Sequence, residues 1–177
     1  MHLRNPVVLA WSFAGPIGIR LAVDRAVAPS ALILAASFAR NPHPYLGACG
    51  LLASPWLLAP ITRVSRAKVL LGGSSTPDLR LLLRTAHAGL SGRVLSERTR
   101  AVLGVDESRL LPSIGIPVLY LRSSRDFVVP ASNSRHLVGL CPQMRVVTIN
   151  GPHLALATDP AAAASAISAF LSELVSA

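Results

Sequence analysis

The sequence predicts an α/β fold, with a parallel sheet of about four strands, flanking helices and a helical insertion. Short apolar runs typical of buried strands occur at residues 6–11, 31–35, 116–121 and 145–149. Segments with helical spacing separate them, as parallel strands require, because a crossover must return the chain to the same end of the sheet. A long stretch punctuated by prolines and lacking strand alternation, residues 41–114, divides the first pair of strands from the second.

The first two strands and the helix between them form a βαβ unit, which we assign to residues 1–40. The connecting helix is expected over residues 13–26, because Ile17 and Leu21 fall at helical spacing. Pro16 fits the first helical turn, where backbone N–H groups have no intrahelical acceptor. Such a unit predicts parallel strands and a right-handed crossover.

Residues 41–114 are expected to form a helical cap inserted between the sheet elements. The apolar spacing predicts helices over residues 51–61, 77–88 and 91–103 and a short one over 107–114. Trp56 and Leu57 could line a substrate pocket, but packing inside any helical cap explains the same residues.

Residues 115–177 are expected to return to the sheet. The third strand ends in a polar loop that contains Asp126, and a helix over residues 130–140 leads to the fourth strand. The last helix has the clearest boundary, with Asp159 as its N-cap and Pro160 at its first position.

Composition and charge narrow the possible classes of protein. With 177 residues, 51% of them hydrophobic and 14% charged, the chain is expected to fold as one domain. The net charge of +9 comes from singly scattered basic residues, and aromatic residues make up 5% of the chain. No basic stripe with stacking aromatics is present, so we expect no nucleic-acid partner.

Cysteine usage and the N-terminal residues predict a cytoplasmic protein. Cys49 and Cys141 lie far apart and show neither metal-ligand nor disulfide-framework spacing, so we expect two thiols in a reducing compartment and no metal. The N-terminus lacks a signal-peptide pattern. The longest uncharged stretch, residues 41–62, contains four prolines and would make a poor membrane span.

Three residues with complementary chemistry follow predicted strands: Ser12 the first, Asp126 the third and His153 the fourth. Parallel sheets place functional groups at the carboxyl ends of their strands. A serine hydroxyl becomes a nucleophile when a histidine takes its proton and an acid orients that histidine. Taken singly, the residues also fit an N-cap, a loop carboxylate and a histidine bonded to backbone groups.

Three blocks of sequence resemble the α/β-hydrolase fold family. "LAWSFAGPIGIRLA" looks like the nucleophile elbow and its helix, "IPVLYLRSSRDFVVP" is similar to the acid-bearing strand and loop, and "RVVTINGPHLALATDPAAAASAISAFL" to the histidine loop and final helix. The order of serine, acid and histidine along the chain is that of the family. The resemblance therefore implies a partial α/β-hydrolase fold.

The resemblance implies a role for each residue that matches the family pattern. Ser12 would be the nucleophile, His153 the general base and acid, and Asp126 the partner that orients the histidine. The backbone N–H of Phe13, directly after the serine, would be one donor of the oxyanion hole.

The implied reaction is hydrolysis of a small apolar ester or thioester without a cofactor, most simply by a carboxylesterase. We expect Trp11, Trp56, Leu57 and Leu154 to line the substrate pocket.

The sequence departs from the family pattern in two ways. Ala10 and Ala14 stand where the elbow usually has glycines, although alanine is still small. Only five residues precede the predicted first strand, so the strands that the family places before it, with a second oxyanion donor, have no counterpart. The first strand would then be an apolar edge that invites self-association. The alternative function is therefore a truncated, weakly active or inactive hydrolase fragment that acts by associating with another chain.

Overall fold

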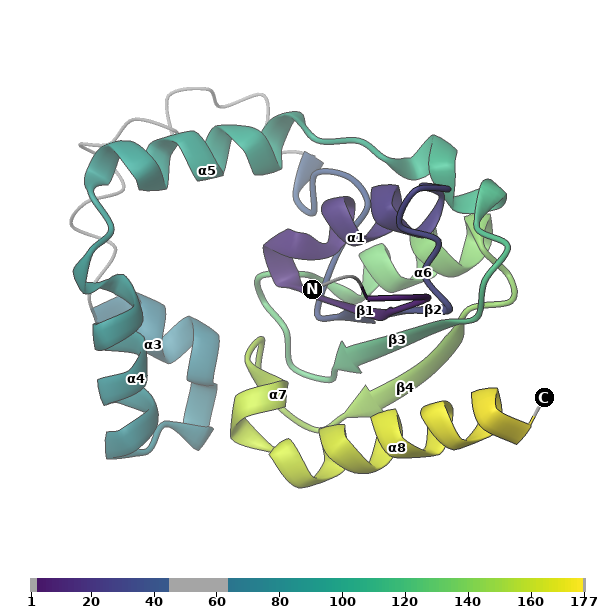
Figure 1. The fold of residues 1–177 in the computed structure, drawn as a ribbon. Coiled ribbons are helices and arrows are strands. Elements are labelled where there is room, and N and C mark those ends of the chain that lie inside the picture. The colour runs from purple at the N-terminus through teal and green to yellow at the C-terminus, as the bar shows by residue number, and fades with distance from the viewer. Residues whose placement is uncertain (1–2, 45–63, 177) are drawn as a thin grey trace.

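A four-stranded, all-parallel sheet forms the centre of the protein (Figure 1). The computed structural model describes residues 3–44 and 64–176. The strands lie in the order β1-β2-β3-β4, and each pairs in parallel with the next. Their bounds are β1 Val7–Trp11, β2 Ala31–Ala35, β3 Val118–Ser123 and β4 Arg145–Ile149. The predicted α/β class with a parallel sheet of about four strands is correct.

The third strand lies two residues further along the chain than predicted. Pairing with β2 begins at Val118, opposite Leu32. Pro117 has no N–H to donate to a strand ladder, and its carbonyl accepts a bond of 3.0 Å from the Leu32 N–H. At the other end, Arg122 and Ser123 continue the strand by pairing with β4. Backbone pairing therefore extends β3 past the apolar run that marked it.

Helices cover both faces of the sheet, and each face has its own core (Figure 1). On one face, Leu32 and Leu34 pack with side chains of α1 Gly15–Ala22 and α6 Ala131–Leu140. On the other face, Ile33 and its neighbours pack with α7 Ala155–Thr158 and α8 Pro160–Ser176. Since every residue of β2 is buried, this strand contributes to both cores, as expected inside a parallel sheet.

Several helical segments separate β2 from β3, and Figure 1 draws the longer ones away from the sheet. Their bounds are α3 Val64–Leu71, α4 Pro77–Ala88 and α5 Gly92–Gly104, with short 3-10 turns at η5 Gly72–Ser74 and η6 Ser108–Ser113. Helix α4 has the predicted bounds, and α5 is displaced by one residue. Helix α3 was not predicted, and the helix expected over residues 51–61 lies outside the described residues.

Helix α1 ends four residues earlier than the predicted end at residue 26. The Asp24 carboxylate accepts a bond of 2.8 Å from the Ala26 N–H, and Ala28 adopts a φ of 42°. A short acidic side chain that bonds nearby backbone favours a turn over continued helix. At α8 the same chemistry caps a helix, because Asp159 accepts from the Ala162 N–H at 3.1 Å.

Strand β1 lies at an edge of the described sheet and is partly uncovered. The side chains of Val7 and Leu9 are 40% and 48% exposed, whereas β2 beside them is fully buried. Both residues pair with β2 residues that belong to the core under α7 and α8, so they lie on that face of the sheet, beyond the part that α8 covers.

Across the described ranges, no helix combines the length and apolar character needed to cross a bilayer.

Candidate active site

Ser12 lies at the point where β1 turns into a helix. Strand β1 ends at Trp11, and a 3-10 turn, η1 Ser12–Ala14, leads directly into α1. Ser12 has a φ of 52°, in the left-handed region that non-glycine residues rarely occupy. Its carbonyl accepts a hydrogen bond of 2.8 Å from the Ser37 hydroxyl. The chain thus reverses around a strained serine, which exposed strand-to-helix elbows require.

Two glycines of α1 allow this turn to pack closely. A Cβ atom at Gly15 would lie 1.6 Å from Ser37 Oγ, and one at Gly18 would lie 2.5 Å from Ala10 Cβ. Close packing at the elbow therefore requires small residues in α1 as well as at Ala10 and Ala14. The two glycines and Ser37 are not among the residues predicted from the sequence, although the "GPIG" segment carries a signal for the glycines.

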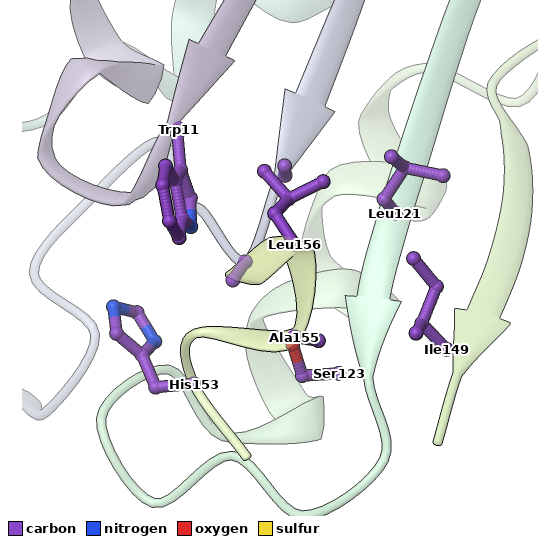
Figure 2. Close-up of a pocket in the computed structure, with 9 residues that line it drawn as sticks. Trp11, Leu121, Ser123, Ile149, His153, Ala155 and Leu156 are labelled. Carbon is purple, nitrogen blue, oxygen red and sulfur yellow. The ribbon is translucent and has the colours of Figure 1, made fainter. Parts of the chain in front are cut away.

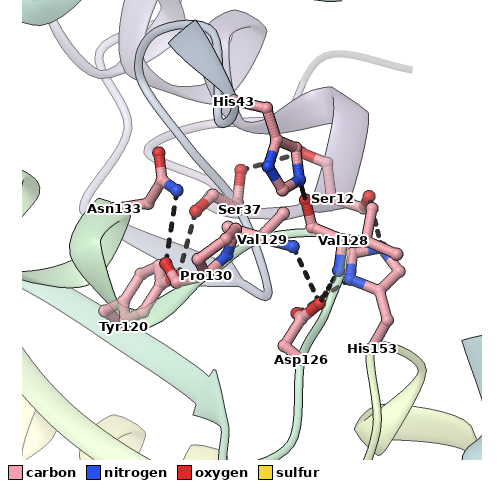
Figure 3. A network of polar contacts seen from close by, with 10 residues as sticks. All are labelled: Ser12, Ser37, His43, Tyr120, Asp126, Val128, Val129, Pro130, Asn133 and His153. Atoms are coloured by element: carbon pink, nitrogen blue, oxygen red, sulfur yellow. Dashed lines mark hydrogen bonds and ion pairs between the residues drawn. The ribbon is translucent and has the colours of Figure 1, made fainter. Parts of the chain in front are cut away.

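His153 lies in the loop between β4 and α7, and its side chain is 3% exposed. Its Nε2 lies 2.8 Å from Ser12 Oγ, and its Nδ1 lies 2.8 Å from Asp126 Oδ2 (Figure 3). An ionised carboxylate only accepts, so Nδ1 carries the proton and Nε2 accepts from the serine hydroxyl. The three residues predicted from the sequence therefore form one continuous hydrogen-bonded chain.

Asp126 is fixed by its own turn as well as by the histidine. Its Oδ1 accepts from the backbone N–H groups of Val128 and Val129, both at 2.8 Å, while Oδ2 faces His153 (Figure 3). The carboxylate is 3% exposed. Because each oxygen has its own donors, the carboxylate cannot rotate without breaking a bond.

The acid loop and the histidine loop are bonded directly to each other. The N–H groups of Ser124 and Arg125 donate to the carbonyls of Ile149 and Gly151 at 3.0 and 2.9 Å. The Ser124 hydroxyl also donates to Asn150 Oδ1 at 3.0 Å and accepts from the Gly151 N–H at 3.2 Å. These bonds continue the β3–β4 ladder past the strands and hold Asp126 beside His153.

A small apolar hollow lies beside His153 and is drawn in Figure 2. Trp11 and Leu156 line it together with His153, but the space among them is too small for a water molecule. The expected pocket residue Leu154 is not part of this lining, and its backbone N–H bonds to the Leu70 carbonyl at 3.1 Å. Trp56 and Leu57, the other expected pocket residues, lie outside the described residues.

A second hollow has a volume of about 140 Å³. Its lining includes Val69, Arg125, Phe127 and Pro152. Phe127 follows Asp126 directly, and its side chain is 77% exposed. This hollow therefore adjoins the two loops that carry the acid and the histidine.

Phe13 follows Ser12 as the second residue of η1, with its side chain 42% exposed. Backbone N–H groups at the start of a helical segment lack intrahelical acceptors. The position is therefore compatible with the expected oxyanion donor, and that role stays a prediction.

Tyr120, on β3, supports the elbow from below. Its hydroxyl donates to the Ser37 carbonyl at 2.9 Å, and its side chain is 1% exposed. Burial, and next the nearby negative charge of Asp126, raise the pKa of the Tyr120 phenol far above its ordinary value. The phenol therefore stays protonated and donates to Ser37, whose own hydroxyl donates to the Ser12 carbonyl.

The described residues contain no group of three histidine, cysteine or acidic side chains that could hold a metal ion. His153 bonds to Asp126 through Nδ1 and to Ser12 through Nε2. The chemistry that the arrangement itself supports is proton transfer from a serine hydroxyl.

Solved structures with the same arrangement of elements identify the fold. An α/β-hydrolase enzyme from a Medee basin deep-sea metagenome library superposes with a TM-score of 0.68 at 16% identity, over 94% of this chain and 64% of that one. An enol-lactonase from Burkholderia xenovorans LB400 gives 0.79 at 17% identity, over 93% and 64%. A thermophilic esterase from Thermogutta terrifontis gives 0.76 at 19% identity, over 95% and 65%.

The chain has part of the α/β-hydrolase fold. It spans 64% of the length of the enol-lactonase structure that it matches. No protein-family model matches the sequence, and no curated protein matches it either. At these identities the α/β-hydrolase fold is shared, while activity depends on the site itself.

Proposed function

We propose that the chain is a serine hydrolase that cleaves small apolar carboxylic esters, with Ser12, His153 and Asp126 as its catalytic residues. One observation carries the proposal. The Ser12 hydroxyl, the His153 ring and the Asp126 carboxylate are joined by hydrogen bonds of 2.8 Å, with the serine on a left-handed turn at the end of a parallel strand. A structural serine or histidine needs no such alignment.

The first half of the reaction would acylate the serine. As Ser12 Oγ attacks the ester carbonyl, its proton passes to His153 Nε2, and the Nδ1 bond to Asp126 stabilises the imidazolium that forms. His153 then donates the proton to the departing alkoxide, so the alcohol leaves and an acyl-serine remains.

The second half would release the acid. A water molecule takes the position of the alcohol, gives a proton to His153 and attacks the acyl carbonyl, and the proton returns to Ser12 Oγ. We assign the Phe13 N–H to the oxyanion that forms in both halves, where one such donor supplies about 100- to 1000-fold in turnover.

The substrate assignment rests on the surroundings of the site. Trp11 and Leu156 place apolar side chains beside His153, which favours an uncharged acyl group over a charged one. The similar structures include an esterase and an enol-lactonase, and a lactone is itself a cyclic ester. We assign residues 41–114, which include α3 to α5, to a cap that shapes access to the serine.

The competing proposal is a chain that is inactive alone and works with a further polypeptide. The exposed Val7 and Leu9 beside the elbow favour it, as does the 64% coverage of the enol-lactonase structure. The two proposals differ in whether the isolated chain reacts at Ser12.

Hydrolysis of p-nitrophenyl butyrate by the purified chain, compared with Ser12→Ala, tests the proposal. We expect turnover that Ser12→Ala reduces to the rate without enzyme, whereas Ser172→Ala, an exposed serine on α8, has no effect. A fluorophosphonate probe should label the wild type and Ser172→Ala but not Ser12→Ala. Equal rates for wild type and Ser12→Ala would refute the assignment of the nucleophile, and a wild type that neither turns over nor labels would favour the competing proposal.

A further inference from the structure

The Asp126 carboxylate depends on the turn that follows it. Its Oδ1 is held by the N–H groups of Val128 and Val129, so the direction of Oδ2 toward His153 follows from how this turn is placed. Whatever fixes the peptide groups of the turn therefore also fixes the acid.

His43 contacts this turn from a distant part of the chain. Its Nε2 lies 2.9 Å from the Val128 carbonyl oxygen, across 85 positions of sequence (Figure 3). A carbonyl only accepts, so Nε2 carries a proton and donates. The His43 backbone N–H in turn donates to Asn41 Oδ1 at 2.9 Å, which holds the segment that presents the ring.

A second contact joins the same two segments. Asn133, which is 6% exposed at the start of α6, donates through Nδ2 to the carbonyls of Pro42 and Pro130 at 3.3 and 3.2 Å. Residues 41–43 thus contact the acid turn at Val128 and the chain just after it at Asn133. The peptide group between Val128 and Val129 accepts from His43 through the Val128 carbonyl and donates to Asp126 through the Val129 N–H.

We propose that His43 is a positioning residue for Asp126, acting through the peptide group between Val128 and Val129. The inference rests on the proposed catalytic role of Asp126, but the contact that it concerns can be measured without substrate. The ring Nε2–H of His43 donates to the Val128 carbonyl and so fixes the turn. The Val128 and Val129 N–H groups of this turn donate to Asp126 Oδ1, which leaves Oδ2 directed at His153 Nδ1. Among the described residues, no hydrogen bond or ion pair joins His43 to Ser12 or to His153, so its bonded connection to the site passes through the turn.

Two substitutions of His43 distinguish the effect of losing its N–H donor from the effect of losing the volume of its ring. His43→Ala removes the N–H, whereas His43→Gln places an amide N–H at similar reach. His136→Ala is the matched control, since His136 is also part-buried and bonded through Nε2, but to the Ser108 hydroxyl and away from the acid turn.

The first readout is the downfield proton resonance of the His153 Nδ1–H, assigned by its loss in Asp126→Asn and recorded without substrate. We expect His43→Ala to broaden it through faster exchange with solvent, and His43→Gln and His136→Ala to retain it. In the ester assay, His43→Ala should lower kcat about 10- to 100-fold with little change in KM, as expected for a misplaced catalytic group.

An unchanged resonance in His43→Ala would overturn the proposal, and so would a wild type without the resonance, since no ordered Asp126–His153 bond would then exist to be positioned. Equal losses in His43→Ala and His136→Ala would also overturn it, by showing a general effect on folding. A normal pattern of resonances in a chain that hydrolyses no ester would support the role of His43 and contradict only the proposed function.

Discussion

Ser12 occupies a backbone conformation that costs free energy, and buried hydrogen bonds maintain it. A left-handed non-glycine residue is disfavoured by about 1–2 kcal/mol. The Ser37 hydroxyl holds the Ser12 carbonyl, and the Tyr120 hydroxyl holds the Ser37 carbonyl, with both side chains almost fully buried. The orientation of Ser12, the proposed nucleophile, is therefore set by two residues whose hydrogen bonds do not involve its hydroxyl group.

Ser37→Ala should impair turnover as well as stability. Loss of the donor to the Ser12 carbonyl leaves a part-buried acceptor without its partner, at a cost of about 1 kcal/mol in unfolding free energy. It also frees the elbow to relax, and we expect kcat to fall about tenfold or more. Urea unfolding and the ester assay measure the two effects separately.

Ser134→Ala is the matched control for this prediction. Ser134 is also a buried serine whose hydroxyl donates to a backbone carbonyl, that of Ala131, but it lies within α6. It should lower stability and leave kcat unchanged. A similar fall of kcat in both variants would show that the loss comes from stability and not from the elbow.

At the scale of elements, helix α1 packs on the sheet through backbone contact at Gly18. A Cβ there would lie 2.5 Å from Ala10 Cβ and 3.2 Å from a Leu32 methyl group. Both neighbours lie in the strands beneath, so neither can move away freely. The glycine therefore sets the separation between α1 and β1, and with it the height of the elbow above the sheet.

Gly18→Ala should destabilise the protein, although alanine favours helices. Forcing a methyl group into this contact costs about 1–3 kcal/mol. Gly139→Ala, in α6, meets no atom within 4 Å and should instead stabilise by about 0.5–1 kcal/mol. Thermal unfolding of the two variants checks the opposite signs, and a stabilised Gly18→Ala would contradict the packing described here.

Elements with their own apolar period could be predicted from the sequence, and those formed by tertiary contact could not. Strands β2 and β4 and helix α4 have the predicted bounds. Helix α7, with four residues, is too short to show a period, and it follows a residue whose N–H is held by the Leu70 carbonyl. The sequence around α7 cannot predict a bond to so distant a residue.

The residues of the candidate site also fall into those that local sequence predicts and those that only tertiary contacts reveal. Ser12, Asp126 and His153 follow strands and carry recognisable chemistry, so the sequence alone could predict them. Ser37 and His43 act on backbone groups of other segments, and nothing in their neighbourhood marks them. Residues that bond to peptide groups become visible only when the fold brings those groups together.

For the whole molecule, the uncovered edge at β1 is the main departure from a closed α/β architecture. Parallel sheets are normally covered on both faces, and apolar edge strands invite pairing with other chains. Val7 and Leu9 leave this region both apolar and accessible in the described structure. Self-association through β1 therefore remains our prediction.

Leu9→Lys should reduce that association without loss of folding. Leu9 is 48% exposed, so its substitution removes little core, while the added charge opposes strand pairing. Val175→Lys, at a 90% exposed position near the end of α8, adds the same charge far from the edge and should change nothing. Light scattering after size-exclusion chromatography gives the masses, and a monomeric wild type, or equal effects of the two variants, would show that β1 is not the contact.

The hydrogen bond between Ser12 and His153 closes a loop of 141 positions, whereas the bond between His153 and Asp126 spans 27. Contacts distant in sequence carry the larger loop-closure entropy and tend to form late in folding. The acid and histidine loops can therefore meet as soon as β3 and β4 pair, while the serine joins them only once β1 has docked through β2. Reactivity at Ser12 would then be a reporter of completed folding, and refolding followed by a fluorophosphonate would time the docking of the first strand.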